Sequence, residues 1–331
     1  MLDPGTPTGI GSLPFDDPRV ACDVELRLHP ELPAAPQLPR VSVCESMVAQ
    51  IASGMRGVKV CHDGSIEVDR RRLAPAQEGD GLCFESWCGT LTFLDTIAKR
   101  RGPAKVQLTG PLTLGLALMD SGVRAARAFS IASATVRAQV TDLLALMRVR
   151  CPEVLPVVVL DEPSLVGTTG DDFPLPPEET IDILSGGLAS ATSAGAAVAG
   201  IHACGPVDWS LALHAGPDLI SVPASPEVAV DSPSISVFLD RGGWIAWGVV
   251  PTDRPLSGRD TPYWRRLHET WAALAASGCD PVRLRTQALV TPACGLATHD
   301  VGQVPAIMGL VRRVAERVQD QALAVRMSAG A

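Results

Sequence analysis

Short apolar runs alternate with longer helical segments along nearly the whole chain, and this pattern limits its fold more than any other feature. Most of the runs are bounded by glycine or proline, as buried strands of a parallel sheet should be. Strands are expected at residues 8–12, 34–38, 105–109, 155–161, 198–202, 218–223, 243–248 and 287–291. Helices are expected between them, including residues 123–149, 178–194, 263–276 and 304–321. Alternating strands and helices predict an α/β fold with a parallel sheet, and eight such units suggest a (β/α)8 TIM barrel.

The connection between the second and third expected strands is long and contains a hairpin signal. Within residues 57–69, Asp63-Gly64 separates two short segments of alternating polarity, and this dipeptide favours a tight hairpin turn. We interpret the hairpin as an insertion over one end of the barrel. Because no internal repeat or low-complexity tail divides the chain, residues 1–331 are predicted to form a single catalytic domain.

The composition argues against several classes of protein. A chain with 46% hydrophobic and 19% charged residues should fold around a large core. Its net charge of −8 and aromatic content of 4% argue against nucleic-acid binding, which uses basic surfaces and stacking rings. We find no secretion signal, no apolar stretch of the roughly 20 residues that a membrane span needs, and no paired cysteine spacing. We therefore expect a cytoplasmic protein without nucleic-acid or membrane partners.

Polar side chains gather where the expected strands end. In a barrel of this kind, active sites form at the carboxyl ends of the strands. Five of these ends carry the phrases Gly11-Ser12, Thr109-Gly110, Asp161-Glu162, His202-Ala203-Cys204 and Cys294-Gly295. Packing alone does not explain this repetition, so we predict a catalytic site at this end of the sheet.

One imidazole and two thiols suggest a metal site. His202 and Cys204 are two residues apart at a strand end, so their side chains should project to the same side. Cys294, after a later strand, supplies a second sulfur, and the resulting N/S/S donor set is one that Zn²⁺ prefers. Zinc held in this way can bind a substrate thiol at an open position and keep it as a thiolate. The alternative is a hydrogen-bonded core histidine beside buried cysteines.

Two acidic residues follow the fourth expected strand. Asp161 and Glu162 point in different directions because strand side chains alternate, so only one of them can face the centre of the pocket. A carboxylate there could act in catalysis or pair with the amino group of an amino-acid substrate. The alternative for either residue is an acid that caps a backbone turn.

Other residues are candidates for substrate binding. Gly11 and Ser12 could present backbone N–H groups and a hydroxyl to a substrate carboxylate. Thr109 stands at the end of the third expected strand. Trp247 could form a wall of the pocket, although a tryptophan that fills the core is the more ordinary interpretation, and the neighbouring Gly248 could let backbone approach a ligand.

Taken together, these phrases resemble the motifs of a known family. The chain carries them in the family's order as Gly9-Ile10-Gly11-Ser12-Leu13-Pro14, Leu108-Thr109-Gly110-Pro111, Leu160-Asp161-Glu162-Pro163, His202-Ala203-Cys204 and Pro292-Ala293-Cys294-Gly295-Leu296. They are similar to motifs of the C-terminal catalytic barrel of cobalamin-independent methionine synthase. The wider superfamily includes uroporphyrinogen decarboxylase and the zinc methyltransferases that demethylate corrinoid proteins. The resemblance covers residues 8–313, and the His-x-Cys…Cys element is its most specific part.

The resemblance implies a reaction and a set of site residues. Zinc would be held by His202, Cys204 and Cys294, and a homocysteine-like amino acid would be recognised by Ser12 and Asp161. Zinc would bind and deprotonate the thiol, and the thiolate would attack a methyl group in line. The implied activity is a zinc-dependent methyl transfer to a thiol such as homocysteine, as in methionine biosynthesis.

Two features depart from the family pattern. The family's fourth zinc ligand is an acidic residue at the end of the sixth strand, where this chain has Pro223. Glu227 could substitute if the loop bends back, or water could complete the site. The length of 331 residues also leaves no room for the additional N-terminal barrel associated with folate-dependent catalysis. A corrinoid protein is therefore a serious candidate for the methyl donor, beside methyltetrahydrofolate.

Two other classes of function stay open at this point. One is a related enzyme of the same superfamily, either a corrinoid-dependent methyltransferase or a decarboxylase-like enzyme. The other is a non-catalytic ligand-binding homologue that has lost complete zinc coordination at Pro223.

Overall fold

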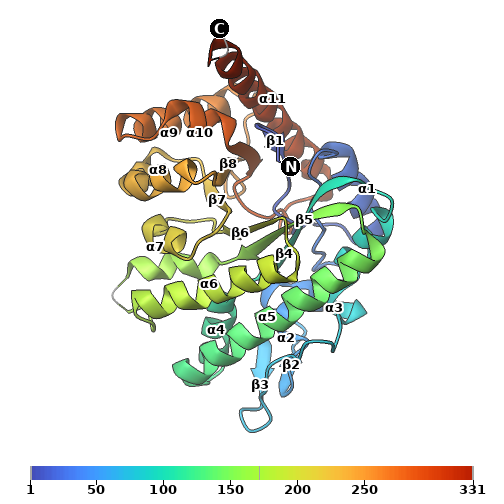
Figure 1. Cartoon of the computed structure of the whole chain (residues 1–331). Coiled ribbons are helices and arrows are strands. Elements are labelled where there is room, and N and C mark those ends of the chain that lie inside the picture. Colours follow the sequence, from blue (N-terminus) through green and yellow to red (C-terminus); the bar gives the residue numbers. More distant parts are fainter. Residues whose placement is uncertain (1, 171, 330–331) are drawn as a thin grey trace.

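A computed structural model describes residues 2–170 and 172–329, and within them a curved parallel sheet of seven strands forms the centre of the molecule (Figure 1). The sheet follows the order β1-β9-β8-β7-β6-β5-β4, and every neighbouring pair is parallel. The strands are β1 Thr6–Pro7, β4 Gly102–Thr109, β5 Val154–Asp161, β6 Val198–His202, β7 Leu219–Pro223, β8 Trp244–Val250 and β9 Ala288–Pro292. Six of the expected strands are thus confirmed, with ends that differ by at most three residues.

The two edges of the sheet, β1 and β4, are bridged by an irregular segment. Residues 33–37 contact β4 through the isolated parallel bridge Ala34↔Lys105, and they contact the segment that follows β1 through the bridge Ser12↔Gln37. No regular strand forms in this described segment, because prolines at positions 33, 36 and 39 remove backbone donors. The sheet therefore curls like a TIM barrel, but a closed barrel of eight strands is not confirmed. The first expected strand also moves, from residues 8–12 to Thr6–Pro7.

Helices follow most of the strands and pack on the outer face of the sheet (Figure 1). They are α1 Pro18–Leu28, α2 Met47–Ala52, α3 Phe84–Thr96, α4 Pro111–Asp120, α5 Ala125–Arg150, α6 Pro177–Ala194, α7 Trp209–His214, α8 Ser232–Asp240, α9 Thr261–Ala276, α10 Pro281–Thr286 and α11 Val304–Ala329. Short 3-10 turns are η1 Val43–Glu45, η2 Pro163–Thr169, η3 Pro226–Asp231 and η4 Val301–Gln303. The four helices named from the sequence are confirmed, and α11 continues beyond its expected end at residue 321. In the described ranges, none of the helices combines the length and apolar character needed to cross a membrane.

The hairpin insertion is confirmed. Strands β2 Val58–Val60 and β3 Ile66–Val68 pair antiparallel and lie at the bottom of Figure 1. Gly64, in the turn between them, has a φ of +81°, a conformation that favours glycine. The division into a single domain stays a prediction. Of the segment between β5 and α6, Asp171 lies outside the described residues.

Strand side chains alternate between two layers. One set, including Val157, Val159, Leu219 and Leu289, forms a cluster inside the curved sheet. The other set, including Trp247, packs between the sheet and the helices. Because side chains alternate along a strand, Asp161, His202 and Ser221 point to the same inner face as the cluster inside the sheet. They lie at or near the carboxyl ends of β5, β6 and β7.

Candidate metal centre

Three inward-facing polar residues stand side by side at the carboxyl end of the sheet. Asp161 of β5 pairs in register with His202 of β6, and His202 pairs in register with Ser221 of β7. All three are buried, with 4% of each residue's surface exposed. Strand parity and parallel register together explain why residues from three separate chain segments meet here.

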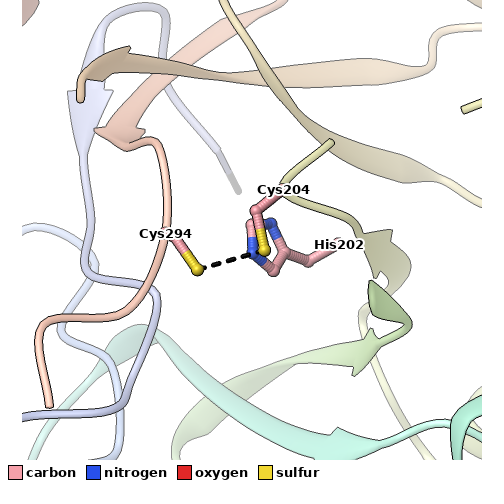
Figure 2. A group of neighbouring side chains, drawn as sticks. All are labelled: His202, Cys204 and Cys294. Atoms are coloured by element: carbon pink, nitrogen blue, oxygen red, sulfur yellow. Dashed lines mark hydrogen bonds between the residues drawn. The ribbon is translucent and has the colours of Figure 1, made fainter. Parts of the chain in front are cut away.

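His202, Cys204 and Cys294 form one group at this end of the sheet (Figure 2). One possible ligand atom from each residue lies within 4.8 Å of the other two. Cys204 follows β6 and Cys294 follows β9, and their Sγ atoms lie 3.0 Å apart. Hydrogen bonds hold both loops, since the N–H of Ala203 donates to Ser221 O and the N–H of Ala293 donates to Val250 O.

The imidazole of His202 has one occupied and one free nitrogen. Its Nδ1 lies 2.9 Å from the Oγ of Ser221. Its Nε2 is buried and has no hydrogen-bond partner in the described part of the chain. A buried polar atom without a partner costs free energy, and a bound ion is one way to satisfy it. Metal-binding histidines commonly use one ring nitrogen for the ion and the other for an orienting hydrogen bond.

The three donors fit a zinc ion. Zn–S distances of about 2.3 Å in a tetrahedral site place two sulfurs about 3.8 Å apart, so the pair of cysteines would need to separate by less than about 1 Å. The hydrogen bond between the thiols lowers the pKa of Cys294 and raises that of Cys204, and His202 lowers the pKa of Cys294 further. The site therefore already favours one thiolate, the form that binds metal. Three protein donors leave a fourth position open.

A cavity of about 370 Å³ lies beside this group and is called the Asp161 cavity here. Its lining includes Asp161, His202, Ser12 and both cysteines of the group. The Oδ1 atom of Asp161 is buried and has no hydrogen-bond partner among the described residues. An unpaired carboxylate oxygen at a cavity wall is suited to a cationic group such as an ammonium.

Lys105 of β4 provides a buried cation beneath Asp161. Its Nζ donates to the carbonyl of Ile10 at 2.6 Å and to the side chain of Gln107 at 3.1 Å. Burial lowers the pKa of Lys105 to about 8, while Asp161 and Glu25 oppose this shift. Burial raises the pKa of Asp161 to about 6, although His202 and Lys105 act to lower it. Asp161 is therefore mostly ionised at neutral pH, with Lys105 as a nearby counter-charge.

The residues expected to bind substrate occupy different places. Ser12 lines the Asp161 cavity, and its hydroxyl donates to the side chain of Gln37 at 3.2 Å. Gly11 lies beneath it with a φ of +136°, where a Cβ would collide with Gln107. Thr109 is buried and donates its hydroxyl to the carbonyl of Met47 at 2.7 Å. Of these three, only Ser12 is in the lining of the cavity.

Glu162 and Trp247 lie away from the site. Glu162 is fully buried and accepts hydrogen bonds from the backbone N–H groups of Leu112 and Thr113 and from the hydroxyl of Thr113. It therefore caps the first turn of α4, the capping alternative raised from the sequence. Trp247 has the outward parity and is fully buried against the helices, as a core tryptophan. Neither residue is in the lining of the Asp161 cavity.

Glu227 does not join the group of donors. It lies in η3, is exposed, and accepts a hydrogen bond from Ser225 at 3.2 Å. Among the described residues, the group of possible ligands contains only His202, Cys204 and Cys294. Pro223, at the end of β7, pairs in register with Gly248 and offers no ligand atom in its side chain.

Sequence reasoning missed Ser221 and Lys105. Ser221 could have been found from the alternation of side chains along β7, since it shares the inward face with Leu219 and lies two residues before the strand ends at Pro223. Lys105 carried no such signal, because a lysine in a short apolar run is normally exposed. His29 is fully buried, and its Nδ1 lies 2.9 Å from the Oε1 of Glu25.

Comparison with known proteins gives one informative result. No family model matches the sequence, and no curated protein matches it significantly. Among solved structures, the chain is similar to a Listeria monocytogenes protein provisionally named a vitamin-B12-independent methionine synthase. The TM-score is 0.56 at 13% identity, over 92% of this chain and 85% of that one. At this identity the likeness shows a shared fold.

Proposed function

We propose that this chain is a zinc-dependent methyltransferase that moves a methyl group to a small thiol, with homocysteine as the first substrate to test. The observation that carries the proposal is the buried Nε2 of His202, which has no partner among the described residues and lies beside two cysteine sulfurs. When bound by His202, Cys204 and Cys294, zinc would supply Lewis-acid stabilisation of a substrate thiolate.

The residues of the Asp161 cavity would hold the substrate. The ionised carboxylate of Asp161 has a free oxygen for the ammonium group of an amino acid. Ser12 lies in the same lining and can contact the substrate carboxylate through its hydroxyl. Both residues share this cavity with the two cysteines, so an amino acid held by Asp161 could extend a thiol towards the sulfurs.

The chemical step is a displacement at carbon. The thiol gives its proton to solvent water, and the resulting sulfur lone pair forms a bond to the methyl carbon. The bond between that carbon and the donor atom breaks, and its electron pair stays on the donor. The protein's part is to place the two reactants in line and keep water away, since positioning alone can remove a large share of the activation barrier of such a reaction. With homocysteine, the product is methionine.

The fold supports the proposal but does not specify the reaction. A curved α/β sheet places the ends of seven described strands around one site, an arrangement used for many chemistries. The similar Listeria monocytogenes structure, provisionally named a methionine synthase, makes methyl transfer the reaction to test first.

The test is a methyl-transfer assay with zinc-loaded protein. Homocysteine is supplied with either methyltetrahydrofolate or methylcobalamin, and methionine is quantified. We expect methionine to form with at least one donor, and Cys294→Ser to abolish it. The matched control is Cys83→Ser, because Cys83 is exposed and lies outside the group. Background rates with both donors would contradict the proposal.

A further inference from the structure

A second cavity meets the two cysteines from another direction. It has a volume of about 510 Å³ and is called the Arg266 cavity here. Cys204, Cys294 and Thr252 line both this cavity and the Asp161 cavity. Asp161, His202 and Ser12 do not line it. The pair of sulfurs therefore lies where two separate recesses join, as a transfer between two reactants requires.

The wall of the Arg266 cavity is built by the ends of β7, β8 and β9 and the start of α9. Much of it is apolar, from Pro223, Val249, Pro251, Pro262 and Ala293. Gly248 lies between neighbouring strand ends, and a Cβ there would come within 2.8 Å of Ala293 Cα. These small and cyclic residues form a surface suited to the organic body of a ligand. The volume falls within the roughly 300–1,000 Å³ typical of small-molecule sites.

The charged groups that line this cavity leave one cation unpaired. Asp253 and Arg254 form an ion pair at 2.8 Å and neutralise each other. Arg266 has no carboxylate partner within the described ranges. Its Nε donates to the carbonyl of Ala224 at 2.7 Å, and its Nη2 lies 3.4 Å from the Oγ of Ser225. These bonds fix the guanidinium at the cavity wall while its charge stays available to a ligand anion.

We infer that the Arg266 cavity binds the methyl donor, and that this donor is a small organic molecule whose carboxylate or phosphate pairs with Arg266. The inference rests on the proposed function. A small donor would place its methyl carbon at the cysteine end of the cavity, opposite the thiol held in the Asp161 cavity. The thiolate lone pair forms the new S–C bond, and the donor keeps the electrons of the broken bond. A donor delivered by a partner protein would not require this recess.

The test measures binding separately from catalysis. The probe is 5-methyltetrahydrofolate, which carries two carboxylates, titrated calorimetrically into the purified full chain with and without zinc. Loss of a charge-assisted hydrogen bond should weaken binding about ten- to a hundred-fold in Arg266→Gln. Arg266→Lys, which keeps the charge, should recover part of the affinity. The KM for homocysteine should not change in Arg266→Gln, whereas the KM for the donor should rise.

The matched control is the neighbouring arginine of the same helix. Arg265 is 73% exposed, lies 3.8 Å from Glu269, and is not in the lining of the cavity. Arg265→Gln should therefore bind the probe like the wild type. This control separates an effect at the cavity from a general loss of positive charge on α9 Thr261–Ala276.

The outcomes separate this inference from the proposed function. Absence of binding by the wild type, or equal binding by wild type and Arg266→Gln, overturns the inference. If homocysteine is then methylated only by a corrinoid donor, the proposed function still stands. Binding that depends on Arg266 supports the site, and if no thiol is methylated in that case, the proposed function fails while the site is retained.

Discussion

The Nδ1 of His202 and the Oγ of Ser221 lie 2.9 Å apart on neighbouring strands, at positions that pair in register. This contact holds the imidazole ring in one orientation. The other ring nitrogen, Nε2, is then left beside the sulfurs of Cys204 and Cys294. An orienting hydrogen bond of this kind commonly strengthens a histidine as a metal ligand, because it fixes the tautomer and the direction of the ring.

Replacement of Ser221 by alanine should weaken zinc binding. Removal of such an orienting partner typically lowers metal affinity about 10- to 100-fold. The measurement is competition with a chromophoric chelator at fixed pH. Ser221→Thr keeps the hydroxyl and should restore much of the affinity, and Ser190→Ala on α6 is a distant control. Equal zinc affinity in Ser221→Ala and the wild type would exclude this role.

Replacement of Asp161 by asparagine should weaken binding of the thiol substrate without removing the metal. The substitution keeps the shape but loses the charge that pairs with an ammonium group, so the KM for homocysteine should rise about ten-fold or more. Zinc content should stay at the wild-type level, because Asp161 is not in the group of donors. A KM that does not change would mean that the amino group is recognised elsewhere.

Replacement of Glu162 by glutamine should change how stability depends on pH. Burial raises the pKa of Glu162 to about 7 from its ordinary 4.5, although hydrogen bonds from Thr113 and Leu112 lower it. Between these two values the folded chain keeps a proton that the unfolded chain loses, so folding is favoured at low pH. This contribution is complete below pH 4.5 and is lost as the pH rises through about 7. The full loss amounts to about 3 kcal/mol.

Urea unfolding of both proteins at about pH 4.5 and about pH 8 measures this effect. The free energy of unfolding of the wild type, relative to Glu162→Gln, should fall by about 3 kcal/mol between the two conditions. A difference that stays constant with pH would show that the Glu162 carboxyl does not titrate in this range. The variant also tests the capping role, since glutamine keeps an oxygen that can accept from the N-terminus of α4.

Much of the fold could be predicted from the sequence because buried parallel strands have a clear pattern. The runs that became β5 and β6 are continuous and apolar, and each ends at a polar residue. The segment at residues 34–38 has a similar apolar content, but its prolines prevent a regular strand. Hydrophobicity alone does not distinguish the strands β5 and β6 from residues 34–38. The number of backbone N–H donors does, because each proline removes one.

The sequence predicts the part of the site that lies at strand ends, but it does not show which face of β5 turns inward or how the surface turns pack. The sequence indicated that His202, Cys204 and Cys294 would gather, and the structure brings their ligand atoms together. Residue alternation alone left open whether Asp161 or Glu162 faces the pocket, and β5 turns only Asp161 inward. The position of Glu227 depends on the path of a surface turn, which no local pattern specifies.

Metal analysis of the purified protein tests the central claim most directly. The wild type is purified under reducing conditions and dialysed against a buffer that contains trace zinc. It should then carry close to one zinc ion per chain. Cys204→Ser and Cys294→Ser should each lose it, because each removes a thiolate ligand, while Cys83→Ser should keep it. A wild type that carries no zinc, or a Cys204→Ser/Cys294→Ser double variant that retains it, would contradict the account.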